Sequence, residues 1–170
     1  MTGHEASSGD APMARYERFA SFSEYEERLD ALIPRALGVI RVFEPRLSAH
    51  YNSQRRCALL QTFLLVDPGR RLYIVVHDAD ALARLCPRLT DLALRHHEQL
   101  KMRRTLAAAS HVHDPHVIVD SSHYLHRFHH AGMRAAQGTG DITGAQSLID
   151  RYEALWEAST PVRVGPPAGL

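Results

Sequence analysis

The segment LYIVV (Leu72–Val76) is the clearest β-strand in this sequence of 170 residues. Five consecutive apolar residues, three of them β-branched, are typical of a strand that is covered on both faces of its sheet. His77 and Asp78 follow at once, and open α/β sheets bind ligands beyond the carboxyl ends of their strands. These two residues are therefore part of a site or, in the case of Asp78, the cap of the next helix.

Strand-like and helix-like segments alternate on both sides of Leu72–Val76. The predicted strands are Gly38–Phe43, Leu100–Arg104 and His116–Asp120, with His123–His130 as an antiparallel partner. One predicted helix begins at Ser23. Three more cover Ser53–Val66, Asp80–His97 with a break near Pro87, and Ala145–Ala158, which follows a loop over Gly132–Gly144. This alternation predicts an α/β fold: a single three-layer sandwich with a mixed, mostly parallel sheet and helices on both faces.

Composition narrows the class of protein further. Residues 1–12 have no periodicity and residues 161–170 are rich in proline and glycine, so we expect a disordered lead-in, one domain over 13–160 and a flexible tail. No apolar run is long enough to span a bilayer and the amino-terminal residues do not form a secretion signal. We therefore expect no membrane partner and a cytoplasmic location. A formal net charge of +1 argues against a strongly basic nucleic-acid binder.

Histidine is concentrated in one segment, because seven of the twelve histidines fall between His111 and His130. Imidazole is a common zinc ligand, and alternating histidines can converge on one ion. The segment is similar to the His-x-His-x-Asp-His loop of metallo-β-lactamase-type hydrolases, except that Pro115 stands where that family has its aspartate. His111, His113 and His116 are therefore candidate ligands for zinc or a similar divalent metal. The alternative is a polar, partly exposed segment in a protein that needs no cofactor.

A longer frame in the same segment has a different resemblance. His113, Pro115 and Asp120 follow the spacing of the His-x-Lys-x4-Asp motif of the phospholipase D superfamily, with proline in place of lysine. The order of predicted elements over residues 36–158 is similar to one half-domain of that family, and the ending RYEALWEAST (151–160) resembles its closing helix. The resemblance implies a phospholipase D-like fold.

The same resemblance implies roles for individual residues. In the family the histidine is the nucleophile, the lysine neutralises the phosphate, and the aspartate supports the histidine of a second motif, in the same chain or across a homodimer. Catalytic roles would then fall to His113 and Asp120, if there is any activity. The only lysine, Lys101, lies upstream of His113, so the chain has no His-x-Lys. Arg103 and Arg127 are the candidate phosphate-binding residues, although a guanidinium is a weak substitute for that lysine.

The chain as a whole is similar to a family of uncharacterised proteobacterial domains. The shared strings are Ile74–Asp78 (IVVHD), Cys86–Leu89 (CPRL) and Leu155–Pro161 (LWEASTP). We expect a bacterial, non-catalytic binding or interaction module with a degenerate phosphodiesterase-like site. Its expected partners are a second copy of the chain and a phosphate-containing or nucleic-acid ligand. The alternative is a phosphodiesterase or metal-dependent hydrolase that uses the segment His111–His116.

Overall fold

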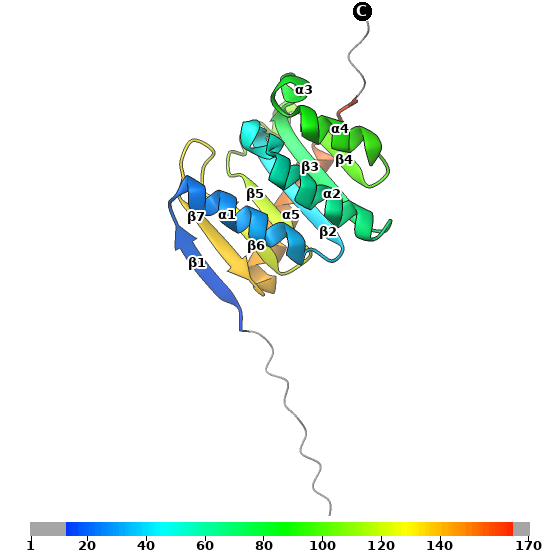
Figure 1. Ribbon diagram of the computed structural model, residues 1–170. Helices are drawn as coiled ribbons and strands as arrows, with labels where there is room; N and C mark the ends of the chain where they lie inside the picture. The colour runs from blue at the N-terminus through cyan, green and yellow to red at the C-terminus, as the bar shows by residue number, and fades with distance from the viewer. Residues whose placement is uncertain (1–12, 165–170) are drawn as a thin grey trace, which may run out of the picture.

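One eight-stranded mixed sheet forms the centre of the molecule in the computed structural model, which describes residues 13–164 (Figure 1). The strands are β1 (Arg15–Phe19), β2 (Val39–Arg46), β3 (Arg71–Asp78), β4 (Leu100–Thr105), β5 (His116–Val119), β6 (His123–Arg127), β7 (Ala135–Thr139) and β8 (Ser159–Pro161). Their order across the sheet is β1-β7-β6-β5-β2-β3-β4-β8. The predicted lead-in over 1–12 and the last six residues of the predicted tail lie outside the described residues.

Five α-helices and three 3-10 turns connect the strands within residues 13–164. They are α1 (Phe22–Leu32), η1 (Ile33–Arg35), η2 (Ala49–Asn52), α2 (Gln54–Val66), α3 (Leu82–Leu85), α4 (Pro87–Arg95), η3 (Ala107–Ala109) and α5 (Ile142–Glu157). The side chains of Ser21, Ser53 and Asp141 cap the three longest helices by accepting a backbone hydrogen bond from the first turn. Ser53 is the predicted start of its helix, whereas α1 and α5 begin before their predicted starts because the cap, and not the first buried residue, sets a helix start. None of the helices in the described part of the chain is long and apolar enough to cross a membrane.

The sheet is mixed, but the expectation that it is mostly parallel is wrong. Only the neighbours β2–β3 and β3–β4 run parallel, and the five other strand pairs are antiparallel. A parallel neighbour needs a long crossover, and the chain makes one only through α2 and through α3 with α4. After β5 the connections are short, so β5, β6 and β7 pair as antiparallel neighbours.

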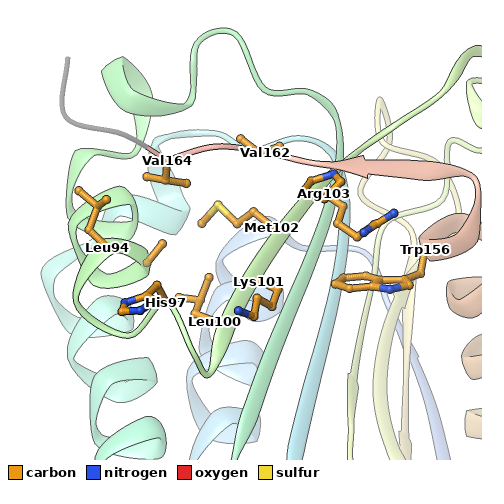
Figure 2. Close-up of a pocket in the computed structure, with 11 residues that line it drawn as sticks. Leu94, His97, Leu100, Lys101, Met102, Arg103, Trp156, Val162 and Val164 are labelled. Atoms are coloured by element: carbon orange, nitrogen blue, oxygen red, sulfur yellow. The ribbon is translucent and has the colours of Figure 1, made fainter. Parts of the chain in front are cut away.

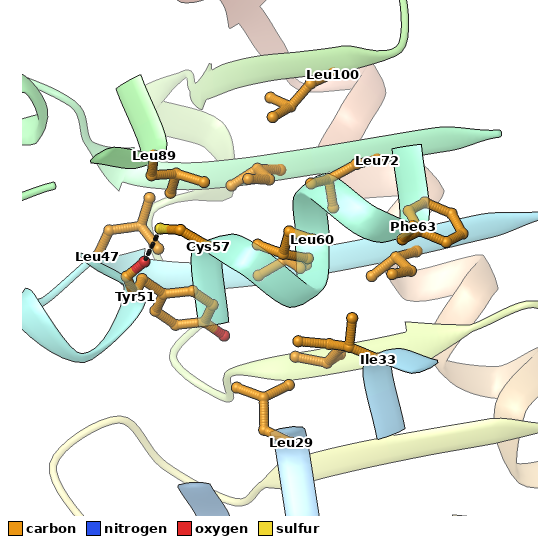
Figure 3. Packing of buried hydrophobic residues seen from close by; sticks show 14 of the residues in the cluster. Leu29, Ile33, Leu47, Tyr51, Cys57, Leu60, Phe63, Leu72, Leu89 and Leu100 are labelled. Carbon is orange, nitrogen blue, oxygen red and sulfur yellow. Dashed lines mark hydrogen bonds between the residues drawn. The ribbon is translucent and has the colours of Figure 1, made fainter. Parts of the chain in front are cut away.

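Apolar residues pack against both faces of the sheet. Leu72, Ile74 and Val76 belong to the core under α1, α2 and α4, while Val75 belongs to the core under α5. Figure 1 shows α1, α2 and α4 on one face, and Figure 3 shows residues of α2, among them Leu60, packed over β3. This alternation confirms that the LYIVV strand is covered on both faces and explains its continuous apolar sequence.

Three strands, β1, β7 and the three-residue β8, have no clear sequence signal, and the first two are the longer ones. β1 (RYERF) is polar and mostly exposed, and β7 (AAQGT) falls within the predicted loop Gly132–Gly144. Both have compositions that are weak for strands, and they become strands because β7 pairs with β1 on one side and with β6 on the other.

Small residues in β7 have a packing role. Gly138 lies opposite Tyr124 of β6 in the antiparallel ladder, and a Cβ at position 138 would overlap with the tyrosine ring. The Tyr124 hydroxyl donates to the Asp141 carboxylate at 2.6 Å, and Asp141 caps α5. Gly138 therefore allows the tyrosine to lie flat over the strand and to reach the helix cap.

We predict that Gly138→Ala lowers the free energy of unfolding by about 1–3 kcal/mol, because the added methyl must displace a buried ring. Urea unfolding measures this change. The matched control is Gly132→Ala, where a Cβ would have its nearest atom, the His129 carbonyl oxygen, at 3.9 Å. Equal stability of the two variants would contradict the packing of Tyr124 over Gly138.

Candidate functional site

Polar side chains gather at the edge of the sheet where β2 and β3 end and β5 begins. Glu44 lies near the end of β2, and His77 is the penultimate residue of β3. The loop before β5 brings His113 to this edge, and the turn after β6 adds His129 and His130. The fold thus collects these groups at the edge where the parallel strands β2 and β3 have their carboxyl ends, and open sheets bind ligands at such edges.

Four imidazole rings, those of His77, His113, His129 and His130, form what we call the histidine cluster. The ring of His113 lies 5.2 Å from that of His130, 5.7 Å from that of His129 and 6.1 Å from that of His77, measured between centroids. His77 is partly buried, and the other three are exposed. Rings at this separation can present several N–H donors to one small ligand.

His77 is the internal support of the cluster. Its Nε2 lies 2.6 Å from the carbonyl oxygen of Val112 and therefore carries the proton, while Nδ1 lies 2.5 Å from the hydroxyl oxygen of Thr105 and accepts from it. Because both ring nitrogens are used inside the protein, His77 orients the loop that carries His113 and has no free nitrogen for a ligand.

The three exposed rings keep donors for a ligand. Nδ1 of His129 accepts from the backbone N–H of Ala131 at 3.1 Å, so Nε2 is the free donor of that ring. The ring nitrogens of His113 and His130 make no hydrogen bond within residues 13–164. Partial desolvation and the neighbouring rings of His129 and His113 lower the pKa of His130. His113, His129 and His130 are therefore the solvent-exposed part of the cluster.

Arg127 lies directly across from Pro115, the position at which the phospholipase D motif has its lysine. The backbone N–H of Arg127 donates to the carbonyl oxygen of Pro115 at 2.9 Å, one position beyond the paired His116 and His126. Residues that face each other across antiparallel strands project from the same face. The side chain of Arg127 therefore projects from the same face of the sheet as position 115.

The guanidinium of Arg127 is already bound within the protein. Nη2 donates to the carbonyl oxygens of His130 at 2.6 Å and Gly132 at 3.2 Å, and Nη1 lies 3.7 Å from a carboxylate oxygen of Glu44. The side chains of both Arg127 and Glu44 are buried. Arg127 thus holds the turn that carries His129 and His130, and its charge has a buried acidic partner.

Further polar groups surround the Arg127–Glu44 pair. Five buried polar atoms in this region have no hydrogen-bond partner among the described residues: Tyr25 Oη, Glu44 Oε2, His50 Nε2, Tyr51 Oη and Arg127 Nε. Burial raises the pKa of Glu44 to about 7, although Arg127 acts in the opposite direction. Burial also lowers the pKa of His50 to about 4, with Arg56 and Arg127 adding to the effect. Loss of either Glu44 or Arg127 would leave the other group buried without its partner, so this pair has a structural role.

The structure does not bring Asp120 to His113. Asp120 follows the far end of β5, and its carboxylate accepts from the backbone N–H groups of Leu37, Gly38 and Val39 at 2.9 Å each. Its φ of 53° lies in the left-handed region, which aspartate tolerates better than most residues. Asp120 therefore fixes the start of β2 and does not orient His113 of the same chain.

The predicted metal ligands are also separated. His111 and His113 are exposed, whereas His116 is fully buried at the start of β5. Within residues 13–164 no three His, Cys, Asp or Glu side chains are arranged to hold a metal ion. The three predicted ligands thus differ in exposure, and a metal site at His111, His113 and His116 stays a prediction.

Asp114 and His126 form a separate network under α5. The Asp114 carboxylate accepts from Nε2 of His126 at 2.8 Å and from Arg151 of α5. Burial alone would raise the pKa of Asp114, but these two hydrogen bonds outweigh it and hold the pKa below its ordinary value. His116 donates from Nδ1 to the Asp114 carbonyl oxygen at 2.9 Å, while its buried Nε2 has no partner in the described residues. This network joins β5 and β6 to α5.

The two arginines predicted to bind phosphate lie on opposite faces of the sheet. Arg127 packs over Tyr25 of α1, whereas Arg103 of β4 packs over Trp156 of α5 with its Cζ 5.0 Å from the ring centroid. Nε and Nη2 of Arg103 donate to Ser159 at 2.7 and 2.5 Å. Arg103 is therefore not part of the edge that carries the histidine cluster.

Comparison with protein families places the chain. The family described as Domain of unknown function (DUF7931) matches residues 22–163. The chain belongs to this family. The match covers every element of the DUF7931 domain from α1 to β8. No curated protein matches the chain in sequence.

Solved structures show where the DUF7931 fold recurs. The phospholipase D family member Nuc from Salmonella typhimurium has a TM-score of 0.66 at 15% identity, over 89% of this chain and 99% of that chain. NucT from Helicobacter pylori has a TM-score of 0.58 at 10% identity, over 88% and 100% of the two chains. TrmBL2, an archaeal chromatin protein with a novel mode of DNA binding, has a TM-score of 0.61 at 14% identity, over 91% of this chain and 56% of that chain. The domain therefore has a phospholipase D-like fold, as the motif spacing and element order predict.

Several residues of the site were not identified from the sequence. His129 and His130 had no assigned role because an isolated strand cannot show which histidines meet across a turn. Glu44 had no signal except its place near the end of a predicted strand, and its burial depends on Arg127. The sequence predicts Arg127 as a phosphate ligand, and only its contacts with Glu44 and the loop carbonyl oxygens show its internal role.

We predict that Asp120→Ala lowers the free energy of unfolding by about 2–4 kcal/mol, because three amide donors lose a charged acceptor. Asp120→Asn should lose less, since the amide oxygen still accepts. Urea unfolding measures both effects. Unchanged stability of Asp120→Ala would contradict the structural role of this aspartate at the start of β2.

We predict that His116 makes the domain less stable in acid. Burial lowers its pKa to about 4, against an ordinary value of 6.5. Between these values the unfolded chain binds a proton that the folded chain does not, so stability falls as the pH drops from 6.5 towards 4, by up to about 3 kcal/mol for this group. His116→Asn keeps a donor near the Nδ1 position and removes the titrating Nε2.

The measurement is urea unfolding of both proteins at pH values from 7 to 4. The wild type should lose more stability over this range than His116→Asn, while His111→Asn, a change at an exposed position, should follow the wild type. His50 and Glu44 titrate in all three proteins and cancel in the comparison. Parallel pH profiles for wild type and His116→Asn would refute the assignment.

Proposed function

We propose that this DUF7931 domain binds a phosphate-containing ligand, nucleic acid in particular, at the histidine cluster without cleaving phosphodiester bonds. The observation that carries the proposal is the state of Arg127: the cation beside the motif histidine is buried, paired with Glu44 and bonded to two loop carbonyls. Phosphoryl transfer needs fixed positive charge on the reacting phosphate. The three exposed imidazoles of His113, His129 and His130 can bind a phosphate group, but they provide no permanent cation.

Other residues at the same edge agree with binding rather than cleavage. Two other arginines there already have acidic partners: Arg46 pairs with Asp78 at 3.4 Å, and Arg104 pairs with Asp80 at 3.2 Å. Asp120 is used by backbone amides at the other end of β5, so His113 has no carboxylate from its own motif to orient it as a nucleophile. TrmBL2 supports a nucleic-acid ligand, because a chain of similar fold binds DNA. Association with a second copy of the chain stays a prediction.

The test is fluorescence anisotropy with a labelled short oligodeoxynucleotide, with inorganic phosphate as competitor. Imidazolium binds phosphate more strongly than neutral imidazole, so we expect affinity to rise about tenfold from pH 8 to pH 6. The lowered pKa of His130 extends this rise below pH 6.5. The double variant His113→Gln/His130→Gln should lose at least about tenfold in affinity at pH 6, since each hydrogen bond to a charged group contributes about 1.5–3 kcal/mol.

His111→Gln is the matched control, because it removes an exposed histidine of the same loop outside the cluster. Equal binding by wild type and the double variant would refute the site. The oligonucleotide and bis(p-nitrophenyl) phosphate should both remain intact after prolonged incubation with the protein. Hydrolysis that His113→Gln abolishes would establish the alternative, a phosphodiesterase, and hydrolysis that requires added zinc would establish a metal-dependent hydrolase.

A further inference from the structure

A cavity of about 450 Å³ lies at the outer edge of β4, away from the histidine cluster (Figure 2). β8 pairs only with Arg103–Thr105, and the last backbone contact along this edge is the Val162 N–H donating to the Met102 carbonyl oxygen at 2.9 Å. The segment that continues to Val164 is outside the strand ladder, and the cavity lies between it, β4 and α4. Its volume is within the range of sites for small organic ligands.

One side of this cavity is apolar. Leu94 of α4 is 39% exposed, although its neighbours on the same helix face the core. Met102, Val162 and Val164 continue this surface, as Figure 2 shows. An apolar wall of this kind favours a ligand with a hydrocarbon or aromatic body, because burial of such a body releases it from water.

The other side of the cavity is cationic. Lys101 and Arg103 stand two residues apart on β4 and project from the same face of the strand. Arg103 is held in place by Ser159 and by stacking over Trp156, and its Nη1 is not used in these bonds. Neither Lys101 nor Arg103 forms a salt bridge within residues 13–164. Two cations without acidic partners therefore flank an apolar cavity.

From this arrangement we infer a second ligand site, which takes a small amphiphilic anion. The negatively charged head, a carboxylate, would bind Lys101 and Nη1 of Arg103, and the apolar body would lie against Leu94, Met102 and Val164. The two cations favour a negatively charged head group, and the apolar wall of the cavity favours an apolar body. A neutral hydrocarbon or a simple anion would therefore bind only one side of the cavity. The site shares no residue with the histidine cluster and does not depend on the function proposed for it.

Trp156 provides a direct readout, because it is the only tryptophan of the chain and it lines the cavity. The experiment is a fluorescence titration of the full chain with decanoate, below its micelle concentration, and with 1-decanol and acetate in parallel. We expect a saturable change with decanoate and binding at least about tenfold weaker for the other two, since each lacks one half of the recognition. Equal responses to acetate and decanoate, or no saturable response to decanoate, would overturn the inference.

Variants separate this site from general surface binding. Lys101→Gln removes an exposed cation and should weaken decanoate binding about tenfold. Leu94→Glu adds a carboxylate to the apolar wall and should weaken it at least as much. Arg95→Gln is the control, because Arg95 is exposed on the same helix, pairs with Asp91 at 2.8 Å and does not line the cavity. Unchanged affinity in both Lys101→Gln and Leu94→Glu would refute the site even if decanoate binds the protein.

Discussion

The site at the edge of the sheet depends on the burial of one charged side chain, Arg127. A guanidinium removed from water must keep its hydrogen bonds and a counter-charge. Glu44 near the end of β2 is its acidic partner, and the carbonyl oxygens of His130 and Gly132 supply acceptors. These contacts fix the turn after β6, and this turn places His129 and His130 beside His113. The arrangement of the histidine cluster is therefore a consequence of how a buried arginine is neutralised.

Under the function that we propose, the same contacts distinguish this chain from a phosphodiesterase of similar fold. A His-x-Lys motif would place a mobile ammonium beside the histidine, where it could meet a phosphate. Here Pro115 has no charge, and the cation on the neighbouring strand is turned inward to Glu44. The edge keeps imidazole donors that face solvent, which suits reversible binding of an anion and gives little stabilisation to the charge that develops during phosphoryl transfer.

The sequence predicts the centre of this fold better than its margins. Strands β2, β3 and β5 are predicted because their apolar and β-branched residues are buried, whereas β1, β7 and β8 depend on pairing that no local pattern records. Helices between strands suggest crossovers and so predict more parallel pairing than the sheet has, because the hairpins after β5 run antiparallel. In the proposed site, motif spacing predicts His113, and its role stays a prediction. His129, His130 and Glu44 have no comparable signal, because their positions depend on contacts across the ladder and beneath a turn.

The most direct test of this account is an NMR titration of the histidine side chains with a short oligodeoxynucleotide, using long-range proton–nitrogen correlations of the imidazole rings. The account predicts that the signals of His113, His129 and His130 shift together and saturate, while those of His116 and His126, under α5, stay in place. The oligonucleotide should be recovered intact. Chemical-shift changes confined to residues outside the histidine cluster, or cleavage of the oligonucleotide during the titration, would contradict the account.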